Sequence, residues 1–265
     1  MWEAFLPVIG FLIGLVSVMV GLGGGFLVVP LLTLVYAFSP ANAVGTSLLV
    51  ILMTTILASA YYTKQKQTYY EIGLILSAAS VPGAISGSYL TTKIPGQVIG
   101  LLVGFFLVFV AWQMVNKKGN VNKHENLERE PGFSEKELLS QKRNLMIGGF
   151  LCFFAGLVGG LLSIPGVLLV PIMALVLNMP FKAVAATSVF TIIFISLASV
   201  IQHTSLGNVN FDFAILLGSG SMFGGLVGAY LCKITSSRTL RWVLAGLLLF
   251  ISLQMFLKFG FGFSY

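Results

Sequence analysis

Apolar runs separated by short polar breaks fill most of the chain, and they fall into two sets of five. The first set lies near residues 4–20, 24–38, 42–62, 70–91 and 97–116, and the second near 144–162, 165–178, 183–203, 211–231 and 239–257. Most of these runs reach the roughly 20 residues that a helix needs to cross the apolar core of a bilayer. The pattern predicts an all-α integral membrane protein of about eight to ten transmembrane helices.

The second run of each set departs from this pattern because it is short and contains helix breakers. It begins with Gly23-Gly24-Gly25 in the first set and with Pro165-Gly166 in the second, and Pro30 and Pro171 follow inside the two runs. Glycine costs a helix roughly 1 kcal/mol and an interior proline about 3 kcal/mol. We therefore expect two interrupted segments, each either a short tilted span or a re-entrant helix.

The two sets of runs repeat each other at a constant offset of 141 residues. The stretch Leu27–Pro30 reads LVVP and Leu168–Pro171 reads LLVP, and VGTS at Val44–Ser47 returns as AATS at Ala185–Ser188. Matches that keep one offset over nearly half of the chain indicate an internal duplication. We divide the chain into a first membrane repeat at 1–116, a charged linker at 117–143 and a second membrane repeat at 144–265.

Composition supports a membrane protein and locates the linker. Hydrophobic residues make up 57% of the chain and charged residues 9%, where soluble domains carry about 25% charged residues. Twelve of the 23 charged residues lie between Lys117 and Arg143. The net charge of +7 therefore belongs to the loops of a protein that sits in a lipid bilayer, and we expect no nucleic acid partner. Within the linker, the sequence SEKE fits a capping box and predicts a helix that starts at Ser134 and leads into the membrane.

Lysine and arginine positions predict that the two repeats have opposite orientations in the plasma membrane. The loop with Lys64 and Lys66 corresponds to a loop of the second repeat, near residues 202–212, that has neither lysine nor arginine. Positive loops face the cytoplasm. If five segments cross in each repeat and the linker is cytoplasmic, nearly all of the positive loops share its side, and Lys93 and Lys258 are the exceptions. We therefore expect inverted-topology repeats in a multi-pass protein.

Paired interrupted segments at matching positions are the sequence mark of a secondary transporter's substrate site. A helix that begins inside the membrane presents free N–H groups and the positive end of its dipole, and glycine lets the backbone approach an anion closely. The candidate residues for a small anionic substrate, with both repeats expected to approach it, are Gly23, Gly24, Gly25, Thr46, Ser47, Pro165, Gly166, Thr187 and Ser188. Two structural interpretations stay open: small residues also serve close helix packing, and serine and threonine often bond to their own helix.

These same stretches carry a resemblance to a known family. GLGGGFLVVP, NAVGTS and the weaker second copy PGVLLVP with AVAATS are similar to the pattern of the TauE/SafE family of sulfite and organosulfonate exporters. The resemblance covers nearly the whole chain outside the linker, and it implies a secondary transporter that exports small sulfur-containing anions. The second copy departs from the pattern, because Ile164-Pro165-Gly166 stands where the first copy has Gly23-Gly24-Gly25.

The residues alone leave other functions open. An anion channel, or a transporter of another small organic anion, could use the same helix dipoles. An intramembrane serine protease would need Ser47 or Ser188 as nucleophile and His203 as base, but it explains neither the duplicated breakers nor the second Thr-Ser pair. We therefore expect no enzyme, and we interpret His203 as an interfacial residue beside a loop.

Few residues suggest a cofactor, a metal or a partner. Cys152 and Cys232 lie in apolar segments without CxxC spacing, so we expect neither a disulfide nor a metal site, and no cofactor. Glu71 and Asp212 stand at predicted helix starts, where an interaction with the helix dipole accounts for them. The oligomeric state stays open, with a homodimer as one option.

Overall fold

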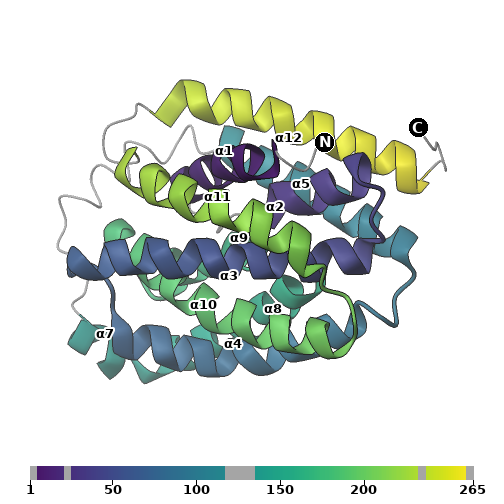
Figure 1. Ribbon diagram of the computed structural model, residues 1–265. Helices are drawn as coiled ribbons and strands as arrows, with labels where there is room; N and C mark the ends of the chain where they lie inside the picture. Colours follow the sequence, from purple (N-terminus) through teal and green to yellow (C-terminus); the bar gives the residue numbers. More distant parts are fainter. Residues whose placement is uncertain (1–4, 21–24, 117–134, 232–236, 261–265) are drawn as a thin grey trace.

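The computed structural model describes residues 5–20, 25–116, 135–231 and 237–260, which form helices and short connections without a strand (Figure 1). The elements are α1 (Leu6–Val20), α2 (Gly25–Pro30), η2 (Leu31–Val35), α3 (Pro40–Lys64), α4 (Tyr70–Leu90), α5 (Gly96–Asn116), α7 (Glu135–Ser140), α8 (Lys142–Leu162), α9 (Gly166–Pro171), η4 (Ile172–Val176), α10 (Phe181–Ser205), α11 (Phe211–Leu231) and α12 (Ser237–Gly260). Among the described residues, five helices are long and apolar enough to cross a membrane: α3, α4, α8, α10 and α11. The prediction of an all-α membrane protein is confirmed.

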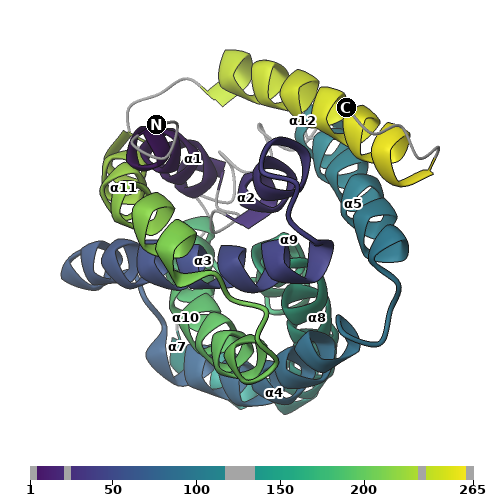
Figure 2. The same cartoon turned by 45° about the vertical axis from the view of Figure 1, so that its right-hand side comes forward.

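The helix boundaries keep the 141-residue offset of the sequence. The elements α2, η2, α3 and α4 correspond to α9, η4, α10 and α11, and both ends of each element shift by 141 residues. The pattern of contacts is reciprocal as well. Helix α1 packs on α11, and its counterpart α8 packs on α4 (Figure 2). In the same way, α3 packs on α11 and its counterpart α10 packs on α4. Two helices also pack on their own counterparts: α3 on α10, and α5 on α12. Reciprocal contacts of this kind are what a two-fold relation between two similar units produces.

Counterpart helices lie antiparallel. A Cβ atom on Gly45, near the start of α3, would lie 3.1 Å from Cβ of His203, near the end of α10. At the other end of the pair, Tyr62 of α3 shares a buried cluster with Ala186 of α10. The contacts of α5 with α12 are reversed in the same way: Gly100 with Phe259, and Gly104 with Met255. The chain direction is therefore inverted between these counterparts.

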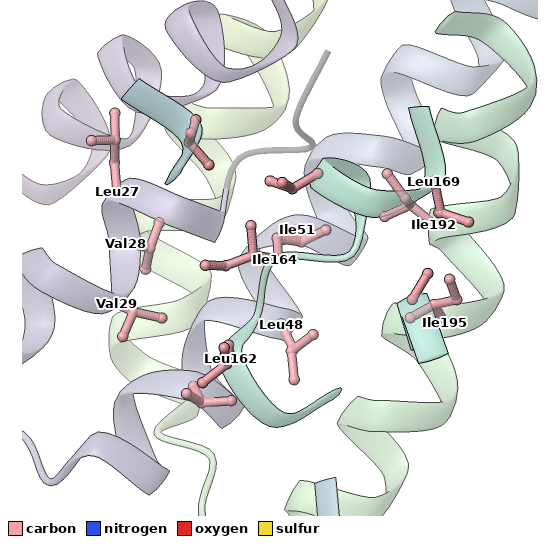
Figure 3. Close-up of a cluster of buried hydrophobic side chains, with 14 of the residues drawn as sticks. Leu27, Val28, Val29, Leu48, Ile51, Leu162, Ile164, Leu169, Ile192 and Ile195 are labelled. Atoms are coloured by element: carbon pink, nitrogen blue, oxygen red, sulfur yellow. The ribbon is translucent and has the colours of Figure 1, made fainter. Parts of the chain in front are cut away.

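The interrupted segments are short helices held inside the protein. In each, a six-residue α-helix that ends in proline continues as a five-residue π-helix, from α2 to η2 and from α9 to η4. Proline has no N–H to close the regular ladder, which accounts for a widened turn at this point. Eleven residues give a helix of roughly 16 Å, about half of the apolar thickness of a bilayer. Figure 3 shows apolar side chains of α2, α3, α9, α10 and the α8–α9 junction in one buried cluster, so α2 and α9 are packed inside the protein.

Glycines bring two helix pairs into backbone contact. In the pair of α4 and α8, a Cβ atom on Gly83 would meet the carbonyl oxygen of Phe153, and one on Gly156 would meet the carbonyl oxygen of Ser80. Gly220, Gly224 and Gly228 of α11 meet carbonyl oxygens of α1 in the same way. In membranes, where apolar burial does not drive helices together, such close approach supplies much of the attraction. The packing interpretation therefore holds for the glycines of these long helices.

Lys258 has a partner within the fold. Its Nζ donates a hydrogen bond of 2.6 Å to the carbonyl oxygen of Thr33. Thr33 belongs to η2, and a cation near the last turn of a helix stabilises the carbonyls that the helix leaves unpaired. This contact accounts for Lys258, which was one of the two exceptions to the rule that the positive charges lie on the cytoplasmic side.

The end of the linker caps a membrane helix. Oε1 of Glu135, the first residue of α7, accepts hydrogen bonds from the backbone N–H groups of Glu71 (2.8 Å) and Ile72 (3.3 Å) at the start of α4. Burial raises the pKa of the neighbouring Tyr69 phenol, and the negative charges of Glu135 and Glu137 add to the rise. A short helix in this part of the linker is confirmed, although Ser134 lies outside the described residues. Glu71 and Asp212 lie in first helical turns, as expected, and both are exposed.

We expect Glu135→Ala to lower the free energy of unfolding by about 0.5–2 kcal/mol, the usual range for loss of a helix cap. Glu135→Gln retains an acceptor oxygen and loses only the charge, so it should lose less. Thermal unfolding of the purified protein in detergent measures both variants. Unchanged stability in both would show that the contact with α4 contributes nothing.

Candidate functional site

The chain leaves α8 through a strained residue that contacts the other repeat. Ser163 adopts φ 62° and ψ 35°, the left-handed region that side chains other than glycine rarely occupy. The residue is fully buried, and its Oγ donates a hydrogen bond of 2.9 Å to Oγ of Ser47 in α3. The hydroxyl pair therefore joins the first repeat to the break between α8 and α9.

The predicted residues Pro165 and Gly166 directly follow this contact. Both are buried, Pro165 precedes the first residue of α9, and Gly166 begins that helix. A Cβ atom on Gly159 would lie only 2.8 Å from Cβ of Pro165, so the break is packed tightly on the last turn of α8. The structure thus brings together Ser47 of one repeat and the breaker of the other, together with Ser163, which the sequence analysis did not single out. Ser163 could have been identified from the sequence, because it is a polar residue two positions before the breaker Pro165.

Thr46 and Thr187 make equivalent contacts across the two repeats. Oγ1 of Thr46 accepts a hydrogen bond of 3.0 Å from the backbone N–H of Asn210, and Oγ1 of Thr187 accepts one of 3.0 Å from the backbone N–H of Tyr69. Thr187 follows Thr46 by 141 residues, and Asn210 follows Tyr69 by the same interval. Each threonine ties its helix to the residue before α11 or α4, so part of its role is to hold the two repeats together.

The structure does not bring the two Thr-Ser pairs to one place. Because α3 and α10 are antiparallel, Thr46 and Ser47 lie beside the end of α10, whereas Thr187 and Ser188 lie near its start. About fifteen residues of helix, roughly 22 Å, separate the two levels. Oγ of Ser188 donates to the carbonyl oxygen of Ala185 in its own helix (3.1 Å). The two pairs therefore lie at different levels of the helices, and the approach of both to one small substrate stays a prediction.

The glycine breaker of the first repeat is described only in part. Gly25 is the first residue of α2. Gly23 and Gly24 lie outside the described residues. The site that the structure describes is therefore the one at the second breaker.

His203 lies beside a loop, as expected, and it is packed inside the protein. It lies in the last turn of α10, and its side chain is fully buried. Its Nε2 lies 3.2 Å from the carbonyl oxygen of Gly160, and its Nδ1 has no hydrogen-bond partner among the described residues. Ser188 is roughly 22 Å away along the same helix, too far to pair with His203 as a protease nucleophile would.

The fold and site define a multi-pass helical membrane protein with two related halves, each interrupted by a breaker in the protein interior. The family model described as sulfite exporter TauE/SafE matches residues 6–255, so the chain belongs to this family. It is 31% identical to the probable membrane transporter protein YunE of Bacillus subtilis, over 94% of this chain and 96% of the relative. It is 26% identical to the probable membrane transporter protein MJ0441 of Methanocaldococcus jannaschii, over 95% and 94%. No solved structure matches the chain.

These relationships give the class of activity. The family and the relatives are named as membrane transporters and not as enzymes, and the chain is accordingly a membrane transport protein. The resemblance that the breaker motifs carried is confirmed by the family match over nearly the whole chain.

Proposed function

We propose that the protein is a secondary transporter that exports sulfite and small sulfonates across the plasma membrane. The observation that carries the proposal is the buried hydroxyl pair of Ser47 and Ser163 at the break between α8 and α9. The printed name of the family, sulfite exporter, gives the chemical class of the substrate.

The chemistry of the hydroxyl pair suits an anion with several oxygens. Each hydroxyl can turn its hydrogen toward a ligand, and a hydrogen bond to a charged acceptor contributes about 1.5–3 kcal/mol. Backbone N–H groups at the start of a helical segment add dipolar attraction without a full positive charge. In the protein interior these interactions are stronger than in water. Thr46 stands next to Ser47 on α3 and is equally buried, so we include it with Pro165 and Gly166 in the proposed site.

The direction of the helices supports inverted repeats. A two-fold axis in the membrane plane turns each membrane-crossing helix upside down, and α3 with α10 and α5 with α12 are antiparallel. In this arrangement the end of α3 and the linker face the cytoplasm, and the end of α10 faces outside, as the lysine and arginine positions favour. Two similar halves can then exchange conformations around the site, which exposes it to each side in turn.

Transport in proteoliposomes tests the proposal. We expect uptake of radioactive sulfite into vesicles preloaded with unlabelled sulfite, with saturation as the external concentration rises. Sulfoacetate and taurine should compete, and chloride should not. Flux that rises linearly without saturation would indicate a channel, and no sulfite flux from a monodisperse protein would contradict the proposed substrate class.

A further inference from the structure

A second buried polar cluster lies beside the substrate site, and His203 is its titratable member. Nε2 of His203 is bonded to the carbonyl oxygen of Gly160, while Nδ1 is buried without a hydrogen-bond partner among the described residues. Gly160 is three residues before Ser163 on the chain, and Gly45, which packs on His203, is two residues before Ser47. The imidazole therefore contacts the same two segments that carry the hydroxyl pair.

Two serines with unpartnered hydroxyls accompany the histidine. Ser199 lies one helical turn before His203 on α10, and hence on the same face. Ser88 of α4 reaches toward Gly160, since a Cβ atom there would lie 2.9 Å from its Oγ. Both serines are fully buried, and neither Oγ has a hydrogen-bond partner among the described residues. Buried polar groups are normally paired, so a cluster of unpaired ones at a titratable side chain points to a ligand that binds there.

The other repeat shows that the fold does not require this cluster. The positions related to His203, Ser199 and Ser88 by the 141-residue offset hold Tyr62, Ala58 and Ala229. These residues belong to a buried apolar cluster with Val18, Ala186 and Val189. Tyrosine keeps its proton near neutral pH, whereas histidine exchanges one there. Among the described residues, the polar cluster with a histidine therefore forms at only one of the two equivalent places in the fold.

We infer that His203 binds a proton and that this proton is coupled to the anion at Ser47 and Ser163. The inference rests on the proposed function for the identity of the anion. A proton on the imidazole places a positive charge near the bound anion, and each ligand then raises the affinity for the other by the same factor. A protonated ring needs acceptor oxygens, and the unpartnered hydroxyls of Ser88 and Ser199 can turn toward it. Ionisable side chains inside membrane proteins commonly serve such coupling.

Uncharged groups contact His203 from the surrounding elements: Gly45 from α3, Gly160 from α8 and the backbone of Asn208, and Ser88 of α4 lies on the other side of Gly160. Other titratable side chains stand further along the same elements or are exposed: Cys152, Lys142 and Arg143 of α8, Tyr61, Tyr62 and Lys64 of α3, Tyr70, Glu71 and Tyr89 of α4, and Asp212 of α11. A change with pH at this cluster can therefore be followed through the histidine itself.

Nitrogen-15 NMR of the imidazole tests proton binding directly. The chain has two histidines, so His124→Gln leaves His203 as the only source of the signal. We expect the ring to change from its neutral to its protonated form as the pH is lowered through the range in which the protein stays folded. Ser88→Ala and Ser199→Ala should each move that transition to lower pH. A ring that stays neutral through this range would overturn the inference, whatever the protein transports.

Affinity for methanesulfonate, a sulfonate that carries no second titrating group, tests the coupling. From pH 8 to pH 6 we expect the affinity of the wild type to rise about fivefold or more. In His203→Gln and in His203→Tyr, which installs the residue of the other repeat, the affinity should not depend on pH. The same pH dependence in both variants would overturn the coupling. Absence of methanesulfonate binding to the wild type at any pH, with a titrating imidazole, would contradict the proposed function and leave the proton site standing.

Discussion

Replacing both Ser47 and Ser163 with alanine should lower the affinity of the protein for sulfite by considerably more than about tenfold. Each hydroxyl contributes about 1.5–3 kcal/mol when it donates to a charged acceptor, which corresponds to about ten- to a hundredfold in affinity. Each single variant should therefore lose about tenfold or more. The double variant should lose less than the product of the single effects, because Oγ of Ser163 also donates to Oγ of Ser47.

Ser188→Ala is the matched control for this prediction. Ser188 is the counterpart of Ser47 in the second repeat, but its hydroxyl bonds to Ala185 in its own helix. Its replacement should change sulfite affinity little. Affinity is measured on purified, monodisperse variants whose unfolding temperatures match that of the wild type. Equal losses in Ser188→Ala and Ser47→Ala, or no loss in the double variant, would place the substrate elsewhere.

Gly83→Ala should destabilise the protein strongly. The added Cβ atom would meet the carbonyl oxygen of Phe153, so α4 and α8 would have to separate along their whole contact. Forcing extra volume into a close-packed contact costs typically about 1–3 kcal/mol, and here the obstacle is backbone that cannot rotate away. We expect a lower unfolding temperature and a smaller yield of monodisperse protein.

Gly246→Ala separates this effect from helix propensity. Gly246 lies in α12, and apart from its own helix none of the described residues has an atom within 4 Å of the position that its Cβ would occupy. Because alanine favours the helical state by about 1 kcal/mol over glycine, this variant should be as stable as the wild type or more so. Equal destabilisation by the two substitutions would mean that the contact between α4 and α8 is not the cause.

The local features of the fold could be predicted from the sequence because they depend on residues close together in the chain. The length of the apolar runs and the position of the breakers can be read from short stretches of sequence. The constant offset relates the two repeats, and the boundaries of α3 and α10 differ by that offset at both ends. The π-helical turns after Pro30 and Pro171 could not be predicted. A proline inside a helix can produce a kink, a break or a widened turn, and the packing of the surrounding helices decides which of these forms.

The composition of the site could be predicted only in part. Ser47 and the breaker at Pro165 do lie close together, since Ser163 directly before that breaker bonds to Ser47. Ser47 and its counterpart in the other repeat lie at different levels of the helices. In an antiparallel pair, equivalent positions away from the centre lie at opposite ends, and nothing in the local sequence states which helices pair. The burial of His203 escaped prediction for the same reason, because Gly45 and Gly160 that enclose it come from distant parts of the chain.

The inverted relation of the repeats is the central claim, and labelling of paired cysteines tests it most directly. Lys64 and Ser205 are counterparts at the exposed last residues of α3 and α10. In a background with Cys152 and Cys232 replaced by alanine, Lys64→Cys and Ser205→Cys are exposed to a maleimide that cannot cross the membrane. We predict that Lys64→Cys reacts only in inside-out vesicles and Ser205→Cys only in intact cells. Reaction of both from the same side would contradict the inverted repeat.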